Sequence, residues 1–245
     1  MAEGIGTVLV LGATADIGRA IARAFAAGGH ALQLAARDRA RLEHEARDIR
    51  VRASAPVALY GCDVLADAGG AALVDELDPL PDVAVCVIGL LDGRAERDRD
   101  IAARVMRTNY LGPSLLLGAL AERFEKRGSG VLVGVSSVAG DRGRASNCVY
   151  GSAKAGFSAY LSGLRNRLAA SGVHVVTVKP GYVRTRMTDG MDLPAPLAAT
   201  PDEVADAVVR AVRRRRDVIY VRPIWRWIML VVRVIPERAF KRLKL

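Results

Sequence analysis

The amino-acid sequence predicts an α/β fold, in which a single doubly wound parallel sheet carries helices on both faces. Short apolar stretches rich in β-branched residues alternate with helical patterns along most of the chain. The first of these stretches, Thr7 to Leu11, runs into a glycine-containing turn and then into an alanine-rich helix. A chain of 245 residues with a hydrophobic fraction of 51% suffices for one large core, and no Pro/Ser-rich linker divides it. We therefore expect one domain.

The expected elements follow from hydrophobic periodicity and from signals at the helix ends. Thr200-Pro201-Asp202-Glu203 is a capping box with proline at the first helical position, so a helix should begin there. Gly112-Pro113 should disturb the helical ladder near Asn109. Residues 184–199 should form a loop that serves as a substrate lid. The expected strands are residues 7–11, 31–36, 56–60, 83–87, 131–135, 173–178 and 217–221, and the expected helices are residues 19–27, 39–52, 66–77, 96–127, 147–170 and 201–213.

The net charge of +10 is concentrated near the C-terminus. Residues 1–209 carry 24 basic and 24 acidic side chains, whereas residues 210–245 carry 12 basic and 2 acidic ones. A diffuse basic excess would have suggested nucleic acid. A basic terminal segment that contains Trp225 and Trp227 instead favours an anionic membrane surface or a protein partner. We expect no nucleic-acid binding.

The cysteines and the start of the chain indicate the compartment. Cys62, Cys86 and Cys148 lack metal-ligand spacing, and we interpret them as free thiols in a reducing cytosol, with no metal site. Met1 to Gly6 is polar and runs directly into a strand, which is not the pattern of a secretory signal. Both observations favour a cytoplasmic protein.

Tyr150 and Lys154 lie four residues apart in the expected helix 147–170, so both project from one face. A phenol has a reference pKa of about 10. Because an ammonium one turn away favours the phenolate, we expect Lys154 to lower the pKa of Tyr150 and the pair to act as an acid/base device. Taken alone, the pair can also be a tyrosine packed on a lysine stem. Ser137 follows a buried strand whose end should face the ligand crevice.

The ends of the first two strands have features of a nucleotide site. Gly12 permits a tight turn, Gly18 permits a close approach of the helix, and the amides at the helix start suit an anion. Arg37 ends the second strand, where arginine accommodates a ribose 2′-phosphate and an acidic residue accepts from the 2′-hydroxyl. Arg37 favours NADPH, and Asp38 beside it leaves NADH open.

These motifs occur in the order found in the short-chain dehydrogenase/reductase family, which the chain resembles over residues 7–221. The resemblance implies a Rossmann-type fold and an NAD(P)(H)-dependent reduction of a ketone or oxidation of a secondary alcohol. It also implies that Tyr150 donates the proton, Lys154 binds the nicotinamide ribose, Ser137 positions the substrate oxygen and Asn109 supports a proton relay. A catalytically silent NAD(P)-binding sensor or scaffold is the second hypothesis, which these four intact residues disfavour.

The resemblance also implies which residues contact the cofactor, which Arg37 indicates to be NADPH rather than NADH. Asp16 replaces the middle glycine of the family's glycine loop, and only Gly89 survives of the Asn-Asn-Ala-Gly motif after strand four. Asp63 should lie beside the adenine, although a turn or cap role is the alternative. The segment 180–185 should hold the nicotinamide carboxamide. The expected cofactor-binding residues are Gly12, Thr14, Asp16, Ile17, Gly18, Arg37, Asp63, Val64, Gly89, Tyr150, Lys154, Pro180, Gly181, Val183 and Thr185.

Four stretches resemble more narrowly the subgroup of decaprenylphosphoryl-2-keto-pentofuranose reductases, which act on lipid-linked sugars. This resemblance implies a small or lipid-linked carbonyl substrate, and we expect a homo-oligomer. Residues 1–222 should form the NAD(P)-binding domain, and residues 223–245 a basic amphipathic extension. The extension has three interpretations: packing in the core or an oligomer, peripheral contact with the inner face of the plasma membrane, or a wall for a lipid-bearing substrate. The matching stretches are residues 88–91, 149–156, 180–187 and 235–243.

Overall fold

The computed structural model describes residues 6–66 and 70–243. The polar start of the chain, apart from Gly6, lies outside these residues, as does part of the helix expected at 66–77.

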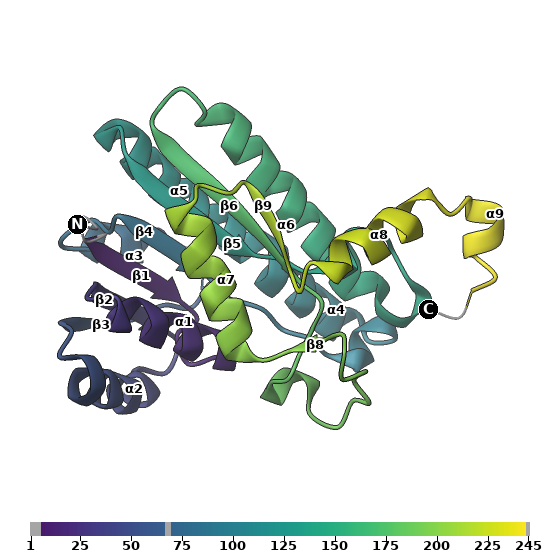
Figure 1. The fold of residues 1–245 in the computed structure, drawn as a ribbon, viewed down its shortest axis with the longest axis horizontal. Coiled ribbons are helices and arrows are strands. Elements are labelled where there is room, and N and C mark those ends of the chain that lie inside the picture. The colour runs from purple at the N-terminus through teal and green to yellow at the C-terminus, as the bar shows by residue number, and fades with distance from the viewer. Residues whose placement is uncertain (1–5, 67–69, 244–245) are drawn as a thin grey trace.

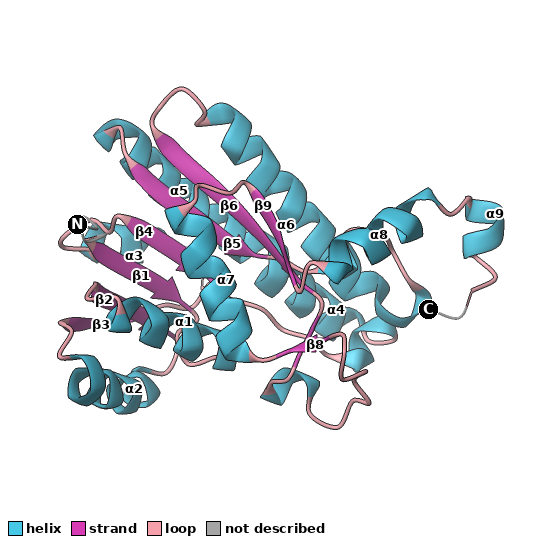
Figure 2. Cartoon of the chain, in the orientation of Figure 1, coloured by secondary structure: helices cyan, strands magenta, loops and turns pink. Residues whose placement is uncertain are grey.

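Seven parallel strands form one central sheet in the order β3-β2-β1-β4-β5-β6-β9 (Figures 1 and 2). The first strand, β1, lies in the middle of the sheet. On one side of it follow β2 and then β3, and β4 pairs with its other side, so the strand order reverses there. Ligands of doubly wound sheets bind at such a reversal, beyond the carboxyl ends of the strands. The predicted fold class is confirmed. The strands are β1 (Thr7–Leu11), β2 (Ala31–Ala36), β3 (Val57–Gly61), β4 (Val83–Cys86), β5 (Gly130–Val135), β6 (Val173–Pro180) and β9 (Val218–Val221).

Two layers of helices cover the sheet because side chains alternate between its faces along each strand. In β1, Val8 and Val10 belong to one buried cluster, and Leu9 and Leu11 belong to the other. The first cluster lies under α1 (Asp16–Ala27), α2 (Arg39–Ala53) and α7 (Pro201–Arg213). The second lies under α3 (Ala71–Glu76), α5 (Gly112–Arg127) and α6 (Cys148–Arg167).

The prediction of one continuous helix over residues 96–127 is wrong. The chain instead forms a short 3₁₀ turn, η1 (Gly93–Glu96), then α4 (Arg99–Met106), a π-helical turn, η2 (Arg107–Leu111), and α5. Pro113 has no N–H to donate to the carbonyl of Asn109, so the ladder changes register, and the N–H of Gly112 bonds to the carbonyl of Arg107. The disturbance predicted near Asn109 is confirmed.

Other boundaries differ by up to five residues. The helix α1 begins at Asp16 rather than residue 19, because the turn after β1 is shorter than expected. The helix α3 covers only residues 71–76, and Ala66 lies in a bend. The helix α6 ends at Arg167, three residues before the expected end. The short 3₁₀ turns η3 (Val138–Gly140) and η4 (Ala145–Asn147) connect β5 to α6.

Residues 184–199, called the lid below, leave and rejoin the body through a short two-stranded ribbon. This ribbon pairs β7 (Tyr182–Val183) with β8 (Ala198–Ala199), and the lid begins with a 3₁₀ turn, η5 (Arg186–Thr188). Residues 189 to 192 are all exposed. The lid lies beyond the carboxyl ends of the strands, below α7 in Figure 1.

The C-terminal helices α8 (Ile224–Val234) and α9 (Glu237–Phe240) extend away from the sheet (Figure 1, yellow). One face of α8 packs inward through Trp225 and Met229, which are both buried. Five large apolar side chains of this helix are exposed: Ile224, Trp227, Leu230, Val231 and Val234. Across residues 6–66 and 70–243, no helix has the length and apolar character needed to cross a bilayer.

Candidate active site

The structure brings Ser137, Tyr150 and Lys154 together, as the sequence predicted. Ser137 caps the 3₁₀ turn η3 just beyond β5, and its Oγ accepts a hydrogen bond from the N–H of Ala139 at 3.1 Å. The Ser137 side chain lies close enough to the Tyr150 phenol to lower its pKa. The neighbouring Ser136 faces α6 instead, because its Oγ donates to the carbonyl of Lys154 at 3.0 Å. This arrangement supports Ser137, rather than Ser136, as the partner of the phenol.

The pKa of Tyr150 moves in the direction opposite to the expected one. The residue is partly exposed, but burial of the phenol raises the pKa to about 12, and the Ser137 side chain lowers it only in part. Burial also lowers the pKa of Lys154 to about 8. The Lys154 ammonium lies 5.9 Å from the centre of the Tyr150 ring. The expected lowering by Lys154 is therefore wrong in this structure, because removal from water disfavours the charged form of both groups.

Lys154 and Asn109 meet at Gly89, just beyond β4. The Lys154 Nζ donates to the carbonyl of Val135 at 3.2 Å. A Cβ added to Gly89 would lie 3.1 Å from Oδ1 of Asn109 and 3.5 Å from Nζ of Lys154. The fully buried Asn109 accepts from the N–H of Leu90 at 3.2 Å and donates to its carbonyl at 2.6 Å. Asn109 thus braces the chain after β4, where the asparagines of the family motif are missing.

The glycine turn between β1 and α1 borders a cavity of about 170 Å³. Gly12 has a φ of 86°, and a Cβ on Gly18 would overlap the carbonyl of Gly12, so the turn and the close helix both require glycine. Among the predicted cofactor residues, Gly12, Thr14, Arg37, Asp63, Val64 and Gly89 line this cavity. Ile17 belongs to the first turn of α1.

Arg37 and Asp38 have different roles at the end of β2. The Asp38 carboxylate caps α2 by accepting from the N–H of Arg41 at 3.2 Å. The Arg37 side chain makes no hydrogen bond or ion pair to any described residue and lines the cavity. Asp63 also lines the cavity, while its Oδ1 accepts from the N–H of Leu65 at 2.9 Å, so the turn role and a place at the cavity coexist.

The segment predicted to hold the nicotinamide follows β6 and leads into the lid. Pro180 ends β6, and Val183 is buried in β7. Thr185 caps the turn η5, with its side chain and N–H both bonded to Thr188. A Cβ on Gly181 would overlap the indole of Trp225. The C-terminal helix α8 therefore packs directly against this segment.

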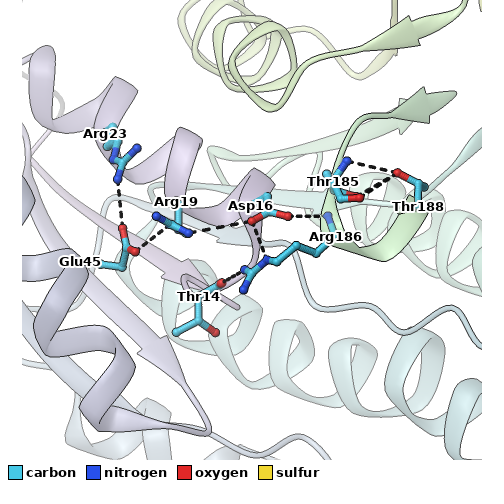
Figure 3. Close-up of polar contacts among 8 residues, drawn as sticks. All are labelled: Thr14, Asp16, Arg19, Arg23, Glu45, Thr185, Arg186 and Thr188. Carbon is cyan, nitrogen blue, oxygen red and sulfur yellow. Dashed lines mark hydrogen bonds and ion pairs between the residues drawn. The ribbon is translucent and has the colours of Figure 1, made fainter. Parts of the chain in front are cut away.

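Asp16 does not face the cavity with the other glycine-loop residues. Its carboxylate accepts from the N–H of Arg186 at 2.8 Å and from the Nε of Arg186 at 2.9 Å (Figure 3). Sequence reasoning missed Arg186, because a pairing across 170 residues leaves no local pattern. It also missed Met187, which lines the cavity next to Thr14, and the contact of Trp225 with Gly181. Arg186 and Met187 could have been found from their place directly after the predicted nicotinamide segment, residues 180–185.

Together, the fold, the glycine turn and the group around Tyr150 are those of an NAD(P)-dependent dehydrogenase or reductase. Residues 6–194 match the family model for short chain dehydrogenases, and the chain belongs to that family. An uncharacterized oxidoreductase of Mycobacterium tuberculosis is 37% identical over 246 residues, which cover 98% of each chain. An uncharacterized oxidoreductase of Streptomyces coelicolor is 36% identical over 97% of this chain and 95% of its own.

Among solved structures, the fold is similar to that of a short-chain dehydrogenase from Sphingobium yanoikuyae in complex with NADPH. The TM-score is 0.80 at 28% identity, over 95% of this chain and 97% of that one. The likeness extends over nearly the whole of both chains. It therefore includes the C-terminal part of this chain beyond residue 194.

Proposed function

We propose that this oxidoreductase reduces a ketone with NADPH and that Tyr150 is the proton donor. The observation that carries the proposal is the grouping of the Tyr150 phenol, whose pKa is raised to about 12, with Ser137 and with the buried Lys154 one helical turn away. Such a phenol keeps its proton at neutral pH, which suits a donor in the reductive direction.

The residues of the cavity fit a dinucleotide. Gly12, Thr14 and Ala15 line the cavity just before α1, whose first amides suit a pyrophosphate. The bound cofactor supplies the hydride. Ser137 orients the carbonyl oxygen towards Tyr150, and Lys154, with a pKa of about 8, is mostly an ammonium at neutral pH and would hold the nicotinamide ribose. Asn109 holds the chain that carries Gly89 in place.

The test is Tyr150→Phe, measured by nucleotide oxidation across a panel of ketones and by the Kd for NADPH. We expect turnover to fall at least about 100-fold, the usual contribution of general acid catalysis, with the Kd unchanged. Ser136→Ala is the matched control, since that hydroxyl bonds to the carbonyl of Lys154 and to the hydroxyl of Ser158 rather than to Tyr150. Retention of more than a few per cent of turnover in Tyr150→Phe would rule out the assignment.

The preference for NADPH rests on the unpaired Arg37 side chain and on the use of Asp38 as a helix cap. A charge-assisted hydrogen bond contributes roughly 1.5–3 kcal/mol. Arg37→Ala should therefore lower the ratio of NADPH to NADH affinity by about one to two decades. Arg39→Ala, another exposed arginine in the same turn, should leave the ratio unchanged. Equal affinities in the unmodified protein would contradict the preference.

The lipid-linked keto-sugar is the substrate class that the C-terminal extension favours. The outer face of α8 exposes 64% of Trp227 and 71% of Val234, and most basic side chains of the extension are exposed around it. This combination fits an anionic bilayer surface, where each basic residue adds about 1 kcal/mol. The inner face of the same helix touches Gly181, so a docked bilayer would lie one helix diameter, about 10 Å, from the nicotinamide segment.

Co-sedimentation with vesicles tests the membrane contact. We expect binding to vesicles rich in anionic lipid at low salt, and little binding to neutral vesicles or at high salt. Trp227→Ala should weaken it, whereas Val51→Ala, an even more exposed apolar site on α2, should not. Deleting residues 236–245 should also weaken binding without loss of activity on a small ketone. No binding to anionic vesicles at low salt would overturn the membrane contact and remove the main support for a lipid-linked substrate.

A further inference from the structure

The first turn of the lid is bonded to the glycine turn by three hydrogen bonds, all from Arg186. Its N–H and its Nε donate to the two carboxylate oxygens of Asp16 at 2.8 and 2.9 Å, and its Nη2 donates to the carbonyl of Thr14 at 2.9 Å (Figure 3). The main-chain bond fixes the path of the lid as well as the position of one side chain. These contacts join segments 170 residues apart.

Arg186 is the principal cation facing Asp16. The other nearby arginine, Arg19, lies 4.0 Å from the same carboxylate and is committed to Glu45, which its Nε reaches at 2.7 Å. Arg23 also pairs with Glu45, at 3.4 Å (Figure 3). Arg19 and Arg23 are therefore already paired with Glu45. Asp16 depends on Arg186 of the lid for its close partner.

The position of Asp16 makes this dependence matter for the cofactor. Asp16 is the first residue of α1, where free amides suit an anion. A carboxylate at this place would repel a phosphate unless a cation neutralises it. Arg186 supplies that cation, and the next lid residue, Met187, lines the cavity beside Thr14. Closing the lid therefore changes both the charge and the shape of the cofactor site.

We propose that Asp16 and Arg186 form a latch that closes the lid on the glycine turn, and that Arg186, positioned by Asp16, contacts the cofactor pyrophosphate. The second part rests on the proposed cofactor site, whereas the latch exists without nucleotide. The replacement of a glycine by Asp16 then has a role: it gives the lid an anchor that a glycine has no side chain to provide.

The latch is tested on the full chain without nucleotide by thermolysin cleavage within residues 189–193, mapped by mass spectrometry. Asp16→Asn and Arg186→Gln should each raise the cleavage rate about fivefold, because an exposed ion pair contributes up to about 1 kcal/mol and cleavage tracks the open population. The double variant should cleave no faster than either single variant. Arg184→Gln is the matched control, since its side chain bonds to no described residue. Unchanged cleavage in both single variants, or multiplied rates in the double variant, would overturn the latch.

The pyrophosphate contact is tested by the Kd for NADPH and for NADH. Both cofactors carry the pyrophosphate, so Arg186→Gln should raise both Kd values about tenfold and leave their ratio unchanged. Asp16→Asn should raise both by a smaller, equal factor, and Arg186→Lys should recover part of the loss. Unchanged Kd values in Arg186→Gln would overturn the contact. Failure of the unmodified protein to bind either nucleotide would instead refute the proposed function, while the cleavage result would still decide the latch.

Discussion

The two ends of the lid are held by contacts of opposite character. At its start, Arg186 pairs with Asp16 while 55% of the arginine side chain is exposed. At its end, the Nε1 of Trp225 donates to the carbonyl of Leu197 at 3.0 Å, and Trp225 is only 5% exposed. An exposed ion pair contributes little and opens readily, whereas a buried indole is held by everything packed around it. The comparison indicates a lid that opens at Arg186 and is hinged at Leu197.

Arg222 reinforces the hinged end. Its Nη1 donates to the carbonyls of Ala195 and Pro196 at 3.2 and 2.7 Å, and its Nη2 pairs with Glu203 at 3.1 Å. The backbone of Arg222 is left-handed, with φ of 59°, a conformation that costs about 1 kcal/mol for a residue with a side chain. The contacts of Arg222 offset that cost. The hinge is therefore built from Arg222, just after β9, and from α8, so the C-terminal extension helps to hold the end of the lid.

The largest effect should come from removing the hinge side chain. Trp225→Ala deletes the packing against Gly181 and Tyr182 and the bond to Leu197, so the free energy of unfolding should fall by about 3–5 kcal/mol. Urea denaturation measures this loss. Trp227→Ala, on the exposed face of the same helix, should change it by less than about 0.5 kcal/mol. Equal losses in the two variants would contradict the division of α8 into two faces.

A smaller effect should appear at high pH beside the hinge. Tyr220 packs against the Trp225 cluster, and its hydroxyl donates to Asp141 at 2.8 Å. Burial first, and then Asp141, raise the pKa of Tyr220 from 10.0 to about 12. Because the folded pKa exceeds the unfolded one, the stabilisation is complete below pH 10 and is lost as the pH rises to about 12.

The measurement is the free energy of unfolding at about pH 9 and pH 12, in the unmodified protein and in Tyr220→Phe. The unmodified protein should lose about 1 kcal/mol more than the variant, a value already reduced for partial exposure. The difference between the two proteins removes the titration of every other group. Identical pH profiles would exclude a contribution of Tyr220 to the hinge.

The smallest effect concerns salt and the opening end. Raising the ionic strength from about 0.1 to 1 M shortens the Debye length from about 10 to about 3 Å. We compare the rate of thermolysin cleavage of the lid in the unmodified protein with the rate in Arg186→Gln at the same salt. The ratio of these two rates should rise about twofold at high salt. Effects of salt on the protease itself cancel in this ratio. A ratio independent of salt would show that the Asp16 pair does not control opening.

Local patterns were sufficient for much of the fold. The limits of β1, β2 and α7 were predicted without error, because an apolar run or a capping box marks each of them. The helix expected at residues 96–127 was wrong because periodicity continues smoothly through a π-helical turn. Only Pro113 signalled the break, and it could not reveal how the chain would re-form its hydrogen bonds.

The candidate site was predictable in its residues and not in its energetics. Ser137, Tyr150 and Lys154 are close in sequence and occupy one strand end and one helix face, so their meeting followed from the predicted elements. The pKa of Tyr150 was predicted in the wrong direction, because spacing reveals a neighbouring charge but not the loss of water. Asp16 and Arg186 pair across the whole domain, and their contact depends on the tertiary path of the lid.

The π-helical turn at residues 107–111 sets the rotation of α5 about its axis relative to α4. It allows Asn109, within the turn, and the buried face of α5, beyond it, to point correctly at once. Deleting one residue here would restore an ordinary α-helix and rotate α5 by about 100°. Leu116, Leu117 and Leu120 would then turn away from the sheet. Chain length at this point is therefore as constrained as residue identity, and a shortened turn that keeps Asn109 would still lose the core beneath it.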